Sequence, residues 1–147
     1  MEKIIALASD HAGYPLKEEI KAYFEKEGIK YIDIGTDSLA SVNYPDYAHK
    51  LCEAITSGEA QLGVLVCGTG IGMSMVANKH KGIRAACCSD TFSARMTRMH
   101  NDANVLCMGA RVVGAGLGID MVDLFINTEF EGGRHTARVE MVNSFDK

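Results

Sequence analysis

The stretch that most constrains the fold is Leu62–Cys67, six apolar residues that run directly into the glycine-rich segment Gly68–Gly72. A strand that is apolar on both faces is typical of the middle of a parallel sheet, where helices cover both sides. Four other mainly apolar runs occur along the chain, over residues 4–8, 31–34, 83–88 and 105–108. With the helical patterns between them, they predict an α/β fold, a three-layer sandwich on a five-stranded parallel sheet.

Apolar residues at helical spacing predict the intervening helices, over residues 16–24, 48–55, 91–99 and 117–126. A shorter helix is expected from the glycine-rich segment toward Asn78, and a last one near His135. The chain has 147 residues and no internal repeat or linker. We therefore predict one domain over residues 1–147.

Charge and composition exclude several classes of protein. The net charge is −4 and the basic residues are scattered, which argues against nucleic acid as a partner. The apolar stretch 103–126 contains three charged residues, and the N-terminal apolar run stops at Asp10, so we expect neither a membrane span nor a signal peptide. Five cysteines, all in apolar segments, are typical of a reducing compartment, so we expect a cytoplasmic protein.

In open parallel sheets, ligands bind beyond the carboxyl ends of the strands. This rule selects four segments before any chemistry is considered: residues 9–11, 67–72, 89–90 and 109–111. In the second of them, glycines alternate with other residues, so backbone N–H groups can converge where a helix begins, which predicts an anion site. Met73 replaces the third glycine of a dinucleotide fingerprint and no lysine follows Gly72, so neither nucleotide motif fits. A tight turn without a ligand is the alternative.

Cys67 ends the central strand beside that turn. A lone cysteine in an apolar strand usually belongs to the core, but a helix N-terminus lowers the pKa of a thiol and makes it a base or a nucleophile. We interpret the other cysteines as packing residues: Cys52, Cys87, Cys88 and Cys107.

Titratable side chains occur at two other places. Asp10 and His11 directly follow the first strand, although Asp10 also suits the cap of the next helix. His100, followed by Asn101, ends the fourth predicted helix and is a candidate acid or base, with a helix-dipole partner as the alternative.

Arginines provide candidate phosphate contacts. Arg134 and Arg138 are four residues apart and share one helix face, where two guanidinium groups suit a phosphate. A solvated patch pairing with Glu131 and Glu140 is the alternative. Arg111, after the fifth strand, could supply a third contact. Together with the thiol and the glycine turn, and with no metal-ligand motif in the sequence, this inventory suits metal-free proton transfer on a small phosphorylated substrate.

The sequence resembles the family of ribose, allose and galactose phosphate isomerases over nearly the whole chain. Several segments carry the resemblance, in family order: residues 9–13, 44–48, 67–74, 77–79, 82–85, 100–106, 109–114, 130–135 and 138–139. One subgroup of the family uses a glutamate within the glycine turn, but this chain has Ile71 at that place and keeps Cys67.

The resemblance implies a Rossmann-like three-layer sandwich and an aldose–ketose isomerase that needs no cofactor or metal. It implies that Cys67 moves the proton between C1 and C2, that His100 opens the furanose ring, and that Thr69 and Asp10 assist. The implied substrate-binding residues are Asp10, His11, Tyr44, Gly68, Thr69, Gly70, Ile71, Gly72, Ser74, Asn101, Arg111, Arg134 and Arg138. It also implies a homodimer or tetramer in which the C-terminal segment, about 128–147, reaches the partner's site.

Three functions stay open at this point. The first is interconversion of D-ribose 5-phosphate and D-ribulose 5-phosphate through an enediolate. The second keeps this chemistry on a hexose phosphate such as allose 6-phosphate. The third is a non-catalytic sugar-phosphate-binding protein, against which the intact Cys67, Thr69 and His100 argue.

Overall fold

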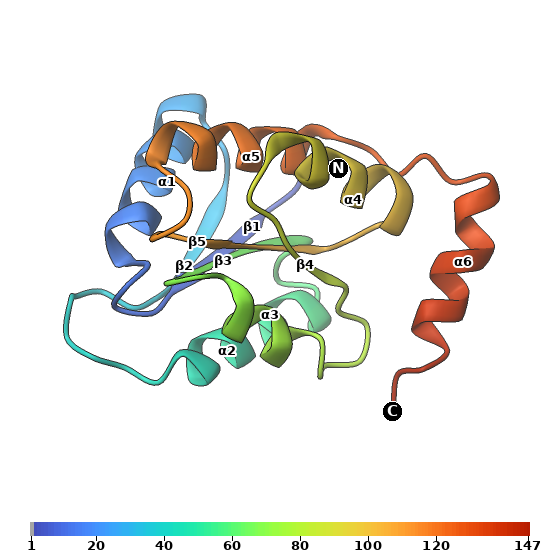
Figure 1. Cartoon of the computed structure of the whole chain (residues 1–147), viewed down its shortest axis with the longest axis horizontal. Coiled ribbons are helices and arrows are strands. Elements are labelled where there is room, and N and C mark those ends of the chain that lie inside the picture. The colour runs from blue at the N-terminus through green and yellow to red at the C-terminus, as the bar shows by residue number, and fades with distance from the viewer. Residues whose placement is uncertain (1) are drawn as a thin grey trace.

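A computed structural model describes residues 2–147, and its centre is a sheet of five parallel strands (Figure 1). The strands are β1 (Ile5–Ser9), β2 (Tyr31–Gly35), β3 (Leu62–Cys67), β4 (Ala85–Cys87) and β5 (Val105–Gly109). They lie in the order β2-β1-β3-β5-β4, so β3 is central, as its apolar run predicts. Every residue of β3 is buried.

Helices cover both faces of the sheet, which confirms the predicted three-layer sandwich (Figure 1). The helices are α1 (Tyr14–Glu27), α2 (Tyr44–Thr56), α3 (Ile71–Ala77), α4 (Thr91–Asn101), α5 (Ala115–Asn127) and α6 (Arg134–Asn143). One core lies between the sheet and α1, α4 and α5, and the other between the sheet and α2 and α3. Val64 and Val66 of β3 belong to the first core, and Leu65 and Cys67 to the second, because side chains alternate along a strand.

The α6 helix stands apart from both layers, at the edge of the molecule beside α4 (Figure 1). Two of its side chains, His135 and Val139, are buried. Two others, Met141 and Val142, are apolar and largely exposed, as is Phe145 just after the helix. Within residues 2–147, no helix is long and apolar enough to cross a membrane.

The fourth strand differs from its predicted extent. The apolar run 83–88 contains only three ladder residues, Ala85–Cys87, and this edge strand pairs with β5 alone. The chain also places β5 between β3 and β4, so the last two strands are exchanged relative to their sequence order.

Candidate active site

The carboxyl ends of β1, β3 and β5 meet at one edge of the sheet. In the ladder, Ser9 is level with Val66, and Cys67 is level with Gly109. The residues that follow these strand ends therefore lie together, as the sheet-edge rule predicts. We call them the carboxyl-edge cluster: Asp10, His11, Cys67, Gly68, Thr69, Gly70, Ile71, Gly72 and Arg111.

The backbone of the glycine turn holds Cys67 in place. The Gly70 N–H donates a hydrogen bond to the Cys67 Sγ atom at 3.1 Å, and the thiol is 5 % exposed. Gly70 has a φ of +82°, and a Cβ atom there would lie 2.8 Å from the Met108 carbonyl carbon. Only glycine tolerates this conformation so close to another backbone. The turn thus brings an N–H group and the thiol to one point.

The rest of the turn is held by local hydrogen bonds. The Thr69 Oγ1 atom accepts a bond from the Ile71 N–H at 3.2 Å, and the Ser74 hydroxyl donates to the Ile71 carbonyl at 2.7 Å. The Tyr44 ring lies against Gly72, where a Cβ atom would approach its Cε1 atom to 2.7 Å. Tyr44 and Ser74 therefore shape the turn from either side.

Asp10 and His11 are also held at this edge. Asp10 is 7 % exposed, and its Oδ1 atom accepts a hydrogen bond from the Gly13 N–H at 2.9 Å. The N-cap of α1 is Gly13, without a side-chain cap bond, so Asp10 orders the turn before the helix and the alternative that it caps α1 is wrong. The Nδ1 atom of His11 accepts a bond from the Val42 N–H at 3.2 Å, which leaves the proton of the neutral ring on Nε2. That N–H is a donor suited to an anion.

Arg111 lies over the glycine turn. Its backbone N–H donates to the Gly68 carbonyl at 3.1 Å, and its Nη1 atom lies 3.5 Å from the place of a Cβ atom on Gly68. The exposed guanidinium therefore brings positive charge to the edge where Cys67 stands.

A second group of predicted site residues lies elsewhere. A cavity of about 770 Å³ opens between α4, β4 and α6, and His100, Asn101 and Arg138 line it. His135 lines it too, and we call these four residues the helical cluster. Arg134 is exposed at the start of α6 and is not among the lining residues.

One chain does not bring the two clusters together. Because α4 runs back between two parallel strands, it ends at the amino edge of the sheet, and His100 precedes Val105, the first residue of β5. Cys67 is level with Gly109, the last residue of that strand. Four residues of strand span about 13 Å. No residue of the carboxyl-edge cluster lines the cavity that His100 lines, among the residues that the structure describes.

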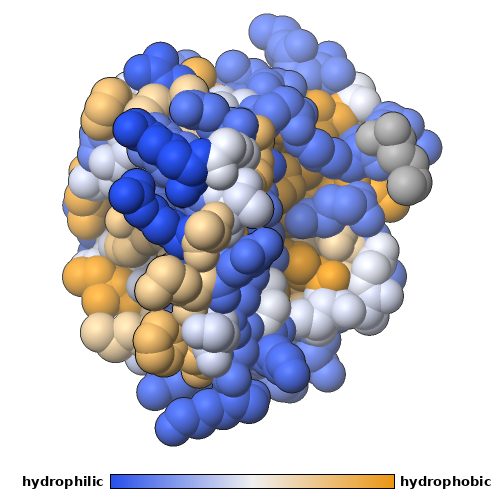
Figure 2. Space-filling view, turned by 90° about the vertical axis from the view of Figure 1, so that its right-hand side faces the viewer, coloured by the Kyte–Doolittle hydropathy of each residue, from blue (hydrophilic) through white to orange (hydrophobic). Residues whose placement is uncertain are grey.

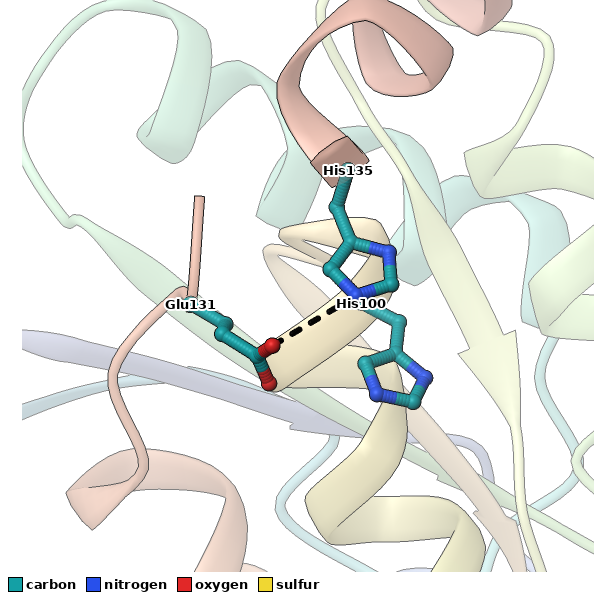
Figure 3. Close-up of side chains that lie close together, drawn as sticks. All are labelled: His100, Glu131 and His135. Carbon is teal, nitrogen blue, oxygen red and sulfur yellow. Dashed lines mark ion pairs between the residues drawn. The ribbon is translucent and has the colours of Figure 1, made fainter. Parts of the chain in front are cut away.

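Two residues of this region were missed in the sequence, namely Glu131 and His135. The rings of His100 and His135 are stacked, with centroids 4.3 Å apart and planes at 16° (Figure 3). Glu131 lies beside them, with its Oε1 atom 3.7 Å from the His135 Nε2 atom. The pKa of His135 is lowered, chiefly by desolvation. By residue type, these three side chains could hold a metal ion, and their ligand atoms lie within 4.8 Å of one another. Both residues belong to the segment 130–135 that carries the family resemblance.

The prediction that all other cysteines are packing residues is wrong for Cys87. Its side chain is exposed, and its Sγ atom lies 3.7 Å from the Thr69 carbonyl oxygen. The reason is its place on the edge strand β4, which leaves one side uncovered. The others are buried, and burial raises the pKa of the Cys52 and Cys88 thiols to about 12 and about 11.

Comparison with known proteins agrees with this geometry. Residues 5–142 match a family model described as Ribose/Galactose Isomerase. Ribose-5-phosphate isomerase B of Escherichia coli is 46% identical over 145 residues, which cover 99% of this chain and 97% of that protein.

Two further relatives extend the comparison. The crystal structure of a ribose 5-phosphate isomerase from Thermotoga maritima has a TM-score of 0.95 at 48% identity, covering 98% of this chain and 99% of the other. D-erythrulose-4-phosphate isomerase of Pectobacterium atrosepticum is 42% identical over 143 residues, 97% of this chain and 94% of that protein. The family model spans nearly the whole chain, and the chain therefore belongs to the ribose/galactose isomerase family.

Proposed function

We propose that this protein interconverts D-ribose 5-phosphate and D-ribulose 5-phosphate through an enediolate, without a metal or organic cofactor. The observation that carries the proposal is the Cys67 thiol, held by the Gly70 N–H at the mouth of the glycine turn. A base beside converging N–H groups suits removal of a proton next to a carbonyl, because the negative charge then develops on oxygen. Relatives that bear this activity by name are 46% and 48% identical.

In this mechanism the Cys67 thiolate takes the proton from C2 of the open-chain aldose and returns it to C1. A proton also passes from the O2 hydroxyl to O1, and the two transfers together convert aldose to ketose. Backbone N–H groups of Gly68–Gly72 donate to the enediolate oxygen, and the Thr69 hydroxyl lies at the same mouth. One such donor is worth roughly 100–1,000-fold in rate. His100 opens the ring by protonating the ring oxygen while the C1 hydroxyl loses its proton.

The remaining polar groups hold the substrate. Asp10 and Asn101 accept or donate hydrogen bonds to sugar hydroxyls. The phosphate is bound by His11, Arg111, Arg134 and Arg138. Binding of the phosphate away from the reacting carbons supplies orientation.

We further propose that a second copy of the chain completes each site, in a homodimer or tetramer. The support is the separation of the two clusters: His100, Asn101 and Arg138 lie at the opposite edge of the sheet from Cys67. The α6 side of the molecule also exposes apolar side chains among polar ones, including Met141, Val142 and Phe145 (Figure 2). Apolar side chains gathered at one face are typical of a surface that contacts another protein. The segment 128–147 is the part that reaches the partner.

The relatives are named for different sugar phosphates, so the identity of the substrate is the part of the proposal that needs a separate argument. The relative named D-erythrulose-4-phosphate isomerase adds a four-carbon ketose to the pentose and hexose phosphates that the sequence left open. The higher identity to the ribose-5-phosphate isomerase B favours the pentose. We place the activity in the cytoplasm, where five free thiols persist.

The test is the initial rate on D-ribose 5-phosphate, D-erythrulose 4-phosphate and D-allose 6-phosphate, in buffer with a metal chelator. We expect the pentose to have the highest kcat/KM. Preference for either other sugar would replace the substrate and keep the chemistry. Turnover of none of them would contradict the proposal and favour the non-catalytic alternative.

A further inference from the structure

His135 has no part in the proposed chemistry, yet it is one of the most buried polar side chains on α6. Its ring is 6 % exposed, and its Nε2 atom has no hydrogen-bond partner within residues 2–147. The ring lies on the His100 ring, and Nε2 faces the Glu131 carboxylate (Figure 3).

The surrounding backbone is built to deliver His135 to this place. The Glu131 N–H donates to the Met99 carbonyl at 3.1 Å, so the segment is attached to the last turn of α4 beside His100. Gly132 and Gly133 then have φ values of +70° and +55°, and the His135 N–H donates to the Gly132 carbonyl at 3.0 Å. This turn starts α6 with His135 directed back onto α4.

A metal ion is the first function that two histidines and a carboxylate bring to mind, but the geometry does not favour one. Lone pairs of imidazole nitrogens lie in the ring plane, and the two planes are stacked at 16°. One ion therefore cannot lie in both planes. Ligands of a tetrahedral zinc with bonds of about 2.0 Å lie about 3.3 Å apart, and the three ligand atoms here spread to 4.8 Å.

The stacked His135 ring instead restrains the orientation of the His100 ring, which no hydrogen bond fixes among the described residues. His100 lies one residue before the end of α4, where helices fray, and its ring makes no hydrogen bond within the described part of the chain. The His135 ring is the group that limits its rotation. A proton donor displaced by 1 Å can lose about 100-fold in rate.

We infer that His135, whose ring lies between Glu131 and His100, is a positioning residue that fixes the His100 ring for opening the sugar ring. The inference rests on the proposed function, because it assumes that His100 acts in ring opening. It assigns to the stack an effect on one chemical step and none on proton transfer at Cys67.

Two measured rates distinguish ring opening from proton transfer at Cys67. Turnover of D-ribose 5-phosphate requires ring opening. Exchange of the C1 hydrogen of D-ribulose 5-phosphate with D2O, followed by NMR, requires Cys67 but no ring opening, because phosphorylation of O5 prevents this ketose from forming a furanose ring. A structural role of His135 would change both rates together.

The variants are His135→Ala, which removes the stack, and His135→Phe, which keeps an aromatic ring of similar size without its nitrogens. For His135→Ala we expect ribose 5-phosphate turnover to fall by about 10–100-fold, with exchange within about twofold of the wild type. For His135→Phe we expect a smaller loss of turnover, and for Glu131→Gln a loss of a few fold, again without loss of exchange. Thermal unfolding of each variant establishes that it is folded.

Val139→Ala is the matched control, because Val139 is also buried on α6 and lines the same cavity. If it separates the two rates as His135→Ala does, loosening of α6 is the cause and the inference is wrong. Parallel losses of both rates in His135→Ala and His135→Phe, or no loss of turnover in either, would also overturn it. His100→Asn must separate the rates; if it does not, the ring-opening role itself fails, and a wild type without turnover would refute the proposed function instead.

Discussion

The carboxyl-edge cluster and the helical cluster are built in different ways. Backbone holds the first: strand ends fix Asp10 and Cys67, and the N–H of Gly70 fixes the thiol. Side chains hold the second, where the end of α4 and the start of α6 meet through the stack of His100 and His135. The proposed base, Cys67, therefore lies at the end of a central strand. The proposed acid, His100, lies at the edge of the molecule, on helix ends that a partner could complete.

The largest effect is expected from removing the base. Cys67→Ala should lower both ribose 5-phosphate turnover and C1 exchange by about 100–10,000-fold, because general-base catalysis is lost. Substrate binding, measured by calorimetry, should change little, since the phosphate contacts remain. Turnover near the wild-type rate would show that Cys67 is not the base.

Mixing two inactive variants tests whether one active site combines the carboxyl-edge cluster of one subunit with the helical cluster of its partner. Cys67→Ala and His100→Asn chains are each expected to be nearly inactive, but a heterodimer would contain one site with both residues intact. After random exchange of subunits in a dimer, we expect recovery of about a quarter of the wild-type activity.

The matched control for this mixture pairs Cys67→Ala with Asp10→Asn. Both residues belong to the carboxyl-edge cluster, so every site keeps one defect and no recovery is expected. With exchange verified by mass spectrometry, failure of the Cys67→Ala and His100→Asn mixture to recover would mean that His100 acts within its own chain.

His100→Asn should have a smaller and more selective effect than the loss of Cys67. We expect ribose 5-phosphate turnover to fall by roughly 100-fold, because an acid is lost from ring opening. Exchange at C1 of ribulose 5-phosphate should persist, since that ketose is already open. Equal losses in both assays would assign His100 to the proton-transfer step instead.

The smallest effect should come from disturbing the turn without removing a reacting group. In Gly109→Ala, the new Cβ atom would lie 2.5 Å from the Thr69 Cα atom. Overpacking of this kind costs about 1–3 kcal/mol of stability, and the displaced turn should lower exchange and turnover together by about tenfold. Gly116→Ala is a suitable control, because nothing lies within 4 Å of the new methyl group. Exchange that falls no more in Gly109→Ala than in this control would contradict the proposed role of the turn.

Local pattern accounts for the parts of this protein that the sequence predicts well. The apolar run of β3, the helical stripes and the placement of Asp10, Cys67 and Arg111 at strand ends all follow from periodicity and from the geometry of parallel sheets. Only the family resemblance marked Tyr44, because no local pattern distinguishes it. His100 is a candidate from its place at the end of a predicted helix, but its role in ring opening comes from the resemblance alone.

By itself, then, the sequence determined the five strands, the glycine turn that ends the third of them, and the family, because each depends on residues close together along the chain. The tertiary structure alone decided that β5 lies between β3 and β4. This order puts β4 at the sheet edge, where Cys87 is exposed. It also decided that His100 and Cys67 lie at opposite edges of the sheet, and that His135 is stacked on His100. These features depend on packing between segments far apart in the sequence, which no local pattern encodes.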